Sequence, residues 1–203
     1  MIHLEPAFPG WLLVLLPLMT AERLLEVVVA RRNTRWARAR GAVESGRGHY
    51  PVMVVLHVAF LAGIVVEITV SRPPFHPLLA GTAVATVVAA NVVRAWCMRA
   101  LGPQWNTRVI VVPGMPLVTH GPYRRLRHPN YAIVVAEGIA LPLVYGTWTT
   151  ALLFTVANAA LLSVRLRTEN AALRQASAVS SPDGQRTVTT PLAPRPVAPG
   201  RLP

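Results

Sequence analysis

The sequence has little cysteine, little charge and no lysine. Its 203 residues include a single cysteine, Cys97, so an intrachain disulfide and a metal site built from cysteines are both excluded. Only 14% of the residues are charged, and all 20 basic residues are arginine. No Gly-x-Gly-x-x-Gly sequence occurs, which removes the usual signature of a dinucleotide-binding Rossmann fold. The character of the chain must therefore come from its apolar residues.

Long apolar runs are what the sequence has in abundance. Hydrophobic residues make up 53% of the chain and its mean hydropathy is +0.43, which is high for a soluble domain. A helix that crosses a bilayer needs about 20 predominantly apolar residues. Five segments approach or meet this length, at about 11–30, 52–70, 78–97, 131–146 and 148–166. We therefore predict an all-α, polytopic integral membrane protein with about five transmembrane helices, the last two forming a hairpin.

The arginines indicate how these helices are oriented. The formal net charge of +12 is typical either of a nucleic-acid-binding protein or of a membrane protein with a basic cytoplasmic face. Arginine-rich loops (31–50 and 98–130) alternate with arginine-poor ones (71–77 and the turn near 146). The positive-inside rule then places the N-terminus outside and the C-terminus in the cytoplasm. It also explains the charge without a nucleic-acid partner.

Several ionisable residues fall inside the predicted spans, where each is costly. They allow two interpretations, a functional site or an ordinary contact such as an internal ion pair or a snorkelling side chain. The ordinary interpretation is favoured for Glu67 and Arg94, which lie near helix ends. Both interpretations stay open for Glu22, Glu26, His57 and Glu137.

Polar residues are densest between 114 and 131. Glycine and proline fix the turns of this segment, and Asn130 beside Pro129 is typical of a helix start whose free amides can receive a ligand. Farther along, Arg165 and Glu169 are four positions apart and share a helix face. Either feature alone has an ordinary explanation, namely a basic membrane-facing loop and a surface ion pair.

Taken in order, these residues resemble the signature of the isoprenylcysteine carboxyl methyltransferases. The resemblance covers about 105–173 and rests on Gly121, Pro122 and Tyr123, the run from Arg127 to Tyr131, a helical hairpin, and Arg165 and Glu169. It implies an integral membrane enzyme that binds S-adenosyl-L-methionine without a Rossmann fold, and it implies no metal. The residues that it places around the cofactor are Met115, Pro116, Leu117, Val118, Tyr123, His128, Pro129, Asn130, Tyr131 and Glu169.

The resemblance also implies catalytic roles. Arg165 would face the acceptor and hold it as an anion, and Glu169 would pair with the ammonium group of the cofactor. An acidic hydroxypyrone or a carboxylate needs no strong base, whereas a resorcinol needs one, for which His128 or a glutamate in the spans is a candidate. One departure concerns Asn170, because the family often has a second acidic residue there.

The N-terminal half resembles one bacterial branch of the family. The residues concerned are Arg32, Asn33, Trp36, Gly41, Glu44, Gly46, His49, Tyr50, Pro51 and His57. This branch is associated with type III polyketide synthases, and it implies O-methylation of an alkylpyrone or alkylresorcinol in the bacterial cytoplasmic (inner) membrane. An isoprenylcysteine-type carboxylate is the other acceptor that the family implies.

The domain organisation follows. We assign residues 1–176 to a single membrane-embedded methyltransferase domain, with residues 105–173 as its cofactor-binding and catalytic part and a cytoplasmic cofactor-binding loop. Residues 177–203 contain six prolines without apolar periodicity, which predicts a disordered tail. The alternatives are an NADPH-dependent membrane reductase of the sterol or isoprenoid type, which has a similar helical hairpin, and a non-enzymatic membrane scaffold.

Overall fold

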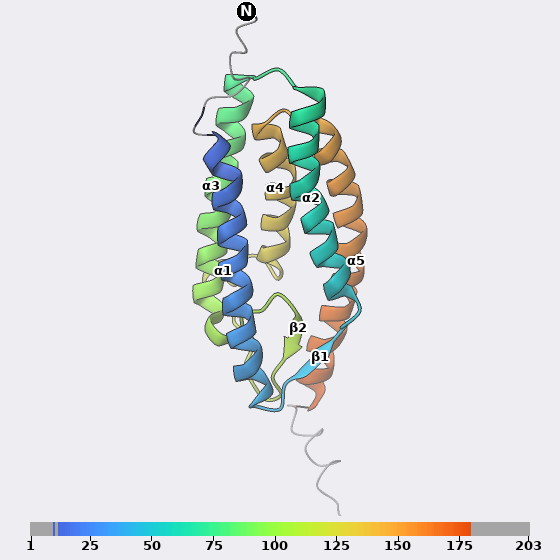
Figure 1. Ribbon diagram of the computed structural model, residues 1–203. Coiled ribbons are helices and arrows are strands. Elements are labelled where there is room, and N and C mark those ends of the chain that lie inside the picture. Colours follow the sequence, from blue (N-terminus) through green and yellow to red (C-terminus); the bar gives the residue numbers. More distant parts are fainter. Residues whose placement is uncertain (1–9, 11, 180–203) are drawn as a thin grey trace, which may run out of the picture.

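The computed structural model describes residue 10 and residues 12–179; residues 1–9, 11 and 180–203, which include most of the predicted tail, lie outside the described part. Five helices form one elongated bundle (Figure 1). They are α1 (Leu12–Arg38), α2 (His49–Ser71), α3 (Pro77–Leu101), α4 (Pro129–Val144) and α5 (Trp148–Val179). Two short 3-10 helices, η1 (Gly102–Gln104) and η2 (Gly121–Arg124), lie between α3 and α4.

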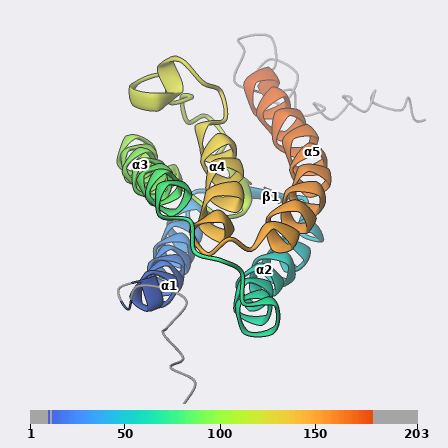
Figure 2. The ribbon, with the colours of Figure 1, turned by 90° about the horizontal axis from the view of Figure 1, so that it is seen from above.

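The short helix α4 lies in the middle of the bundle. Seen from above, α3 and α5 flank α4 in one row, α1 lies next to α3, and α2 lies next to α5 (Figure 2). Aliphatic and aromatic side chains from all five helices meet around α4, among them Phe60, Ile64, Val87, Leu141 and Phe154. Because the apolar stripe of each helix is covered by its neighbours, the bundle has a packed interior although its outer surface is also apolar.

Three helices are long and apolar enough to cross a membrane. These segments are His49–Ser71, Pro77–Gln104 and Trp148–Arg174, and their outward faces expose many valines and leucines. Helix α4 is apolar but has only 16 residues. Helix α1 carries Glu22, Arg23 and Glu26 within its length. The composition thus supports a membrane protein, and the count of five spans stays a prediction.

The helices extend farther than hydropathy predicted. Helix α1 continues to Arg38 and α5 to Val179, beyond the predicted ends at 30 and 166. The extra turns contain arginine and alanine, which are good helix formers, and no glycine or proline interrupts them. The first three residues of the predicted tail therefore belong to α5.

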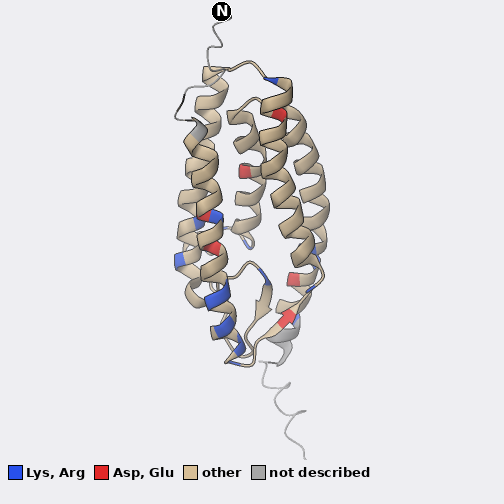
Figure 3. Cartoon of the chain, in the orientation of Figure 1, with Lys and Arg blue, Asp and Glu red and all other residues tan. Residues whose placement is uncertain are grey.

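The sequence predicted an all-α chain, and this prediction was incomplete, because the structure also contains two short strands. Strands β1 (Val43–Ser45) and β2 (Val109–Val111) form an antiparallel pair in which Glu44 lies opposite Ile110. The pair lies at the end of the bundle where most of the arginines gather (Figure 3). It joins the α1–α2 connection to the segment that follows α3.

The predicted hairpin of α4 and α5 is present. Gly146, with φ +69°, allows the tight turn, and the carbonyl of Pro142 accepts hydrogen bonds from the amides of Tyr145 and Thr147. The first turn of α5 is capped from another helix. Glu67 of α2 accepts hydrogen bonds from the amides of Thr149 (3.1 Å) and Thr150 (2.8 Å).

Candidate functional site

The segment before α4 is fixed by close packing on α3. Gly121 has φ +60°, and a β-carbon there would lie 3.1 Å from Nε1 of Trp96, so the turn needs glycine. The 3-10 turn η2 then directs Tyr123 against the buried side chains of Cys97 and Ile133. Burial raises the pKa of the Tyr123 phenol, which stays protonated at neutral pH.

Asn130 joins Tyr123 to the start of α4. Pro129 occupies the first helical position, where its missing N–H costs nothing. The Nδ2 group of Asn130 donates a hydrogen bond to the Tyr123 hydroxyl at 3.0 Å. The Oδ1 atom of Asn130 is buried and has no hydrogen-bond partner among the described residues. A buried acceptor in this state is open to a donor from a ligand.

Glu169 of α5 holds the two helices of the hairpin together at this level. One carboxylate oxygen lies 3.3 Å from Nδ1 of His128, and the other accepts a hydrogen bond from the Tyr131 hydroxyl. His128 also contacts Oδ1 of Asn170 through Nε2, at 3.1 Å, and its ring stacks on Tyr131. The hydrogen bond to Glu169 raises the pKa of His128, because a carboxylate favours the charged imidazolium.

Arg165 lies one helical turn before Glu169 and reaches across to other elements. Its Nη2 donates to the carbonyl of Thr107 at 2.5 Å, and its Nη1 contacts the sulfur of Met53 in α2. Its guanidinium carbon lies 5.7 Å from the ring centre of Tyr131. Its Nε is buried and has no partner in the part of the chain that the structure describes. Arg165 is thus held in place with its Nε donor unpaired.

The structure groups most of the predicted site residues and leaves four apart. Tyr123, His128, Pro129, Asn130, Tyr131, Arg165 and Glu169 all lie around the start of α4 and the facing part of α5. The other four, Met115, Pro116, Leu117 and Val118, lie in the segment between β2 and η2, and in the described part of the chain their side chains form no hydrogen bond or ion pair with this group. Met115 is 38% and Leu117 is 58% exposed, so these two side chains are not packed into the site.

Sequence reasoning gave no role to Glu44, which supports the site from β1. Its carboxylate contacts Arg108 at 2.7 Å, Arg38 at 3.0 Å and Arg47 at 3.6 Å, and its side chain is only 5% exposed. Burial alone would raise the pKa of Glu44, but the hydrogen bonds from Arg108 and Arg38 outweigh it and lower the pKa. Because Arg108 follows Thr107, this contact fixes the carbonyl that Arg165 binds.

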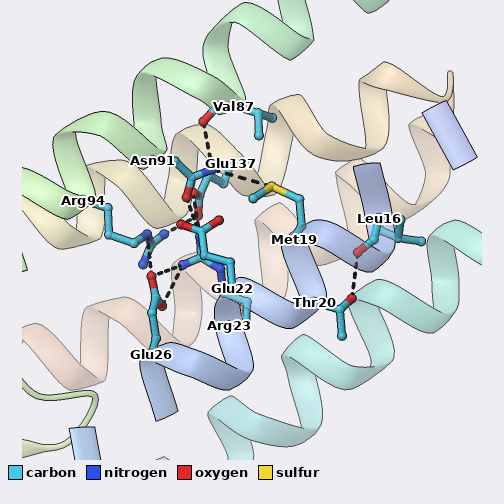
Figure 4. A network of polar contacts seen from close by, with 10 residues as sticks. All are labelled: Leu16, Met19, Thr20, Glu22, Arg23, Glu26, Val87, Asn91, Arg94 and Glu137. Atoms are coloured by element: carbon cyan, nitrogen blue, oxygen red, sulfur yellow. Dashed lines mark hydrogen bonds and ion pairs between the residues drawn. The ribbon is translucent and has the colours of Figure 1, made fainter. Parts of the chain in front are cut away.

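A second polar cluster lies deeper in the bundle. Arg23 of α1 donates to both oxygens of Glu26 and, at 2.7 Å, to Oδ1 of Asn91 in α3 (Figure 4). Arg23 and Arg94 both contact the carboxylate of Glu137 in α4, and Nε of Arg94 lies 3.5 Å from Glu26. Of the two interpretations of the ionisable residues inside the spans, a functional site or an internal ion pair, the structure shows an ion pair for Arg94 and Glu137.

Fold and site together define a class: a helical membrane protein with a polar cluster where the paired helices α4 and α5 meet an arginine-rich end. The sequence profile of the isoprenylcysteine carboxyl methyltransferase family matches residues 83–175. This range contains α4 and, from the cluster at its start, His128, Arg165 and Glu169. The chain belongs to this family, as the resemblance implied. The polyketide-synthase-associated branch remains a prediction.

Bacterial relatives cover most of the chain. It is 38% identical over 167 residues to "Uncharacterized protein YpbQ" of Bacillus subtilis, and the match spans 82% of this chain and 98% of that protein. It is 23% identical over 154 residues to an "Uncharacterized protein" of Haemophilus influenzae, spanning 75% of this chain and 89% of that protein. No solved structure matches the chain.

Proposed function

We propose that the chain is an S-adenosyl-L-methionine-dependent O-methyltransferase that acts in the membrane on a lipid-like acceptor. The observation that carries this proposal is the pairing of opposite charges on consecutive turns of α5. Glu169 is bound by His128 and Tyr131 at the start of α4, and Arg165 lies against Tyr131 one turn deeper. A cationic donor and an anionic acceptor are best recognised by such a pair, with the carboxylate and the guanidinium on one face.

The residues present fit the cofactor. S-adenosyl-L-methionine supplies a methyl group on a sulfonium centre, and it carries an ammonium, a carboxylate and an adenosine. Glu169 would hold the ammonium, because each of its oxygens has a lone pair beyond those used by His128 and Tyr131. The unpartnered Oδ1 of Asn130 would accept a further donor. Tyr123, Pro129 and the loop of Met115, Pro116, Leu117 and Val118 would complete the pocket.

Arg165 would orient the acceptor. Its free Nε can bind an oxygen of the acceptor and favour the anionic form, which is the better nucleophile. Holding this oxygen beside the reacting methyl group raises the rate, because the two reactants are already oriented for the transfer. Alkylpyrones and alkylresorcinols from a type III polyketide synthase pathway, or an isoprenylcysteine-type carboxylate, present such an oxygen beside a long apolar chain.

Five membrane spans give this site access to both reactants. In the proposed orientation the arginine-rich end of the bundle faces the cytoplasm of a bacterium and the chain lies in the inner membrane (Figure 3). The water-soluble cofactor then reaches His128 and Glu169 from the cytoplasm. The acceptor's tail enters between the helices from the bilayer.

Two substitutions distinguish the proposed roles of Glu169 and Arg165. Both variants are assayed in purified membranes with labelled S-adenosyl-L-methionine. We expect Glu169→Ala to weaken cofactor binding by about 10-fold or more, since a charged hydrogen bond is worth about 1.5–3 kcal/mol. We expect Arg165→Ala to lower transfer and to leave cofactor binding nearly unchanged. Arg167→Ala, on the exposed face of the same helix, is the matched control. Full activity in both variants would remove these roles, and calorimetric binding of NADPH instead would favour the reductase.

A further inference from the structure

Helices α2 and α5 run antiparallel and face each other along one side of the bundle (Figure 1). Met53, His57 and Phe60 lie on the inward face of α2, three or four positions apart. Asn158 lies on the inward face of α5, four positions after Phe154. Residues of these two faces therefore meet inside the bundle, between the cofactor-binding end and the membrane core.

His57 and Asn158 lie at the same level of this interface. Near the arginine-rich end, Met53 contacts Arg165. Farther into the bundle, the rings of Phe60 and Phe154 are 4.1 Å apart, and His57 meets the edge of Phe154 at 5.4 Å. His57 falls between Met53 and Phe60 on one helix, and Asn158 falls between Phe154 and Arg165 on the other. The antiparallel register therefore brings the two polar side chains level with each other.

The side-chain amide of Asn158 lies inside the bundle. The residue is only 2% exposed. An asparagine amide has two donors and an acceptor, and nearly all buried polar groups of this kind are hydrogen-bonded. Lipid offers no hydrogen-bond partner to such an amide. A bound polar molecule would supply one.

His57 presents a basic nitrogen to the same region. Its Nδ1 lies 2.8 Å from the carbonyl oxygen of Met53, and a carbonyl only accepts, so Nδ1 carries the proton. In the neutral ring the lone pair is then on Nε2. Among the described residues, Nε2 has no hydrogen-bond partner. The charges that act on the ring from other elements are Arg23 of α1, Arg94 of α3 and Arg165 of α5.

We propose that His57 is the general base for a hydroxyl-bearing lipid acceptor and that Asn158 holds a second oxygen of the same acceptor ring. This inference rests on the proposed methyltransferase function, and it selects a phenol or an enol over a carboxylate. A carboxylate is already ionised and needs no base, whereas a phenol must lose a proton during the transfer.

The step balances with these residues. The acceptor O–H gives its proton to Nε2 of His57, and an oxygen electron pair forms the bond to the methyl carbon. The electron pair of the broken carbon–sulfur bond stays on the donor's sulfur. A neutral hydroxyl and a cationic donor therefore give a methyl ether, a neutral thioether and an imidazolium, which later passes its proton to water.

The test compares acceptors of different acidity. The wild type and His57→Asn are assayed with a long-chain phenol, a long-chain nitrophenol that ionises near neutral pH, and a long-chain carboxylate. Asparagine can keep the donor to the Met53 carbonyl but has no basic nitrogen. We expect a loss of about 100-fold or more in kcat with the phenol, as is typical for removal of a general base, and little loss with the other two. Val58→Ala, one position away and facing outward at 62% exposure, is the control.

The outcomes separate this inference from the function that it rests on. Equal losses with all three acceptors would make His57 structural, and no loss with the phenol would overturn the proposal. A wild type that methylates only the carboxylate would also overturn it while leaving the methyltransferase function in place. A wild type that binds no S-adenosyl-L-methionine and methylates none of the three would remove both.

The role of Asn158 can be tested without measuring turnover, through the unfolding temperature and the binding of the acceptor. Asn158→Leu replaces a buried amide by an apolar side chain of similar size, so we expect the ligand-free protein to unfold at a higher temperature. The same variant should bind the long-chain phenol about 10-fold more weakly, through the loss of its hydrogen bonds. A lower unfolding temperature would show that the amide stabilises the bundle itself and would overturn its role as a ligand contact.

Discussion

At the scale of single residues, Glu169 is the centre of the candidate site. Each of its oxygens has one partner, His128 for one and Tyr131 for the other. His128 is the N-cap residue of α4 and Tyr131 lies in its first turn, so the carboxylate is oriented by the helix start that also carries Pro129 and Asn130. A carboxylate held in this way can receive an ammonium without a change in its own position.

The pair of His128 and Glu169 should make stability depend on pH. The pKa of His128 is raised in the folded protein, because Glu169 favours the charged ring. The stabilisation is therefore complete below the pKa of the unfolded protein, about 6.5, and is lost as the pH rises through the higher folded value. We expect the unfolding temperature of the wild type to exceed that of His128→Asn most at about pH 6 and least at about pH 9. Thermal unfolding in detergent at several pH values measures this, and an excess that grows with pH would contradict it.

This cluster could be predicted from the sequence, because its members are either close together in the chain or one helical turn apart. His128, Asn130 and Tyr131 adjoin a predicted helix start, and Arg165 and Glu169 lie four positions apart. The contacts of Glu44 could not be predicted in the same way. Its partners include Arg108, 64 positions away, and only the folded loops bring the two together. Local periodicity carries no information about such a contact.

At the scale of elements, the hairpin of α4 and α5 depends on one close approach. A β-carbon at Gly138 would lie 2.4 Å from the ring of Phe154, so the two helices pack through a position without a side chain. We expect Gly138→Ala to destabilise the protein by about 1–3 kcal/mol, the usual cost of overpacking. Gly81→Ala is the control, because no atom lies within 4 Å of its added carbon and alanine favours a helix by about 1 kcal/mol. Thermal unfolding compares them, and equal stability of the two variants would refute the close packing.

The helices themselves were predictable, and the strands were not. Apolar runs located all five helices, because a membrane-type helix is defined mainly by its composition. Strands β1 and β2 have three residues each, and they are stabilised by their pairing and by the ion pairs of Glu44. Segments this short carry no usable alternation of polar and apolar residues. The ends of α1 and α5 were placed too early because hydropathy reports where lipid contact ends, not where the helix ends.

At the scale of the whole molecule, the buried ion network explains how α1 joins the bundle. This helix carries charged residues that a lipid-facing span would exclude, and they are directed toward α3 and α4 instead (Figure 4). Arg23 contacts Glu26, Asn91 and Glu137, so three helices share one set of polar contacts. Removing one partner would leave a buried charge, at a cost of about 3–5 kcal/mol. The network therefore fixes the register of α1 against its neighbours.

The proposed orientation assigns each end of the bundle to one side of the membrane. The α2–α3 connection and the α4–α5 turn lie at the end of the bundle opposite the strands, which has few arginines (Figures 1 and 3). Thr119 precedes η2, which packs on Trp96 and Ala100 near the other end of α3. Single cysteines at the exposed positions 76, 119 and 148 report their side, and the native Cys97 adds little background because it is fully buried. By the positive-inside rule, we expect an impermeant maleimide to label His76→Cys and Trp148→Cys in intact cells.

The same reagent should reach Thr119→Cys only in inside-out vesicles. Helix α3 separates position 76 from position 119, and α4 separates 119 from 148, so the three sites together require both helices to cross. Labelling of Gly10→Cys from outside would show in addition that α1 crosses the membrane. If Thr119→Cys and Trp148→Cys react from the same side, α4 does not span the bilayer, and the count of five is wrong. If the pattern is reversed, the site of His128 and Glu169 faces away from the cytoplasmic cofactor, and the proposed orientation fails.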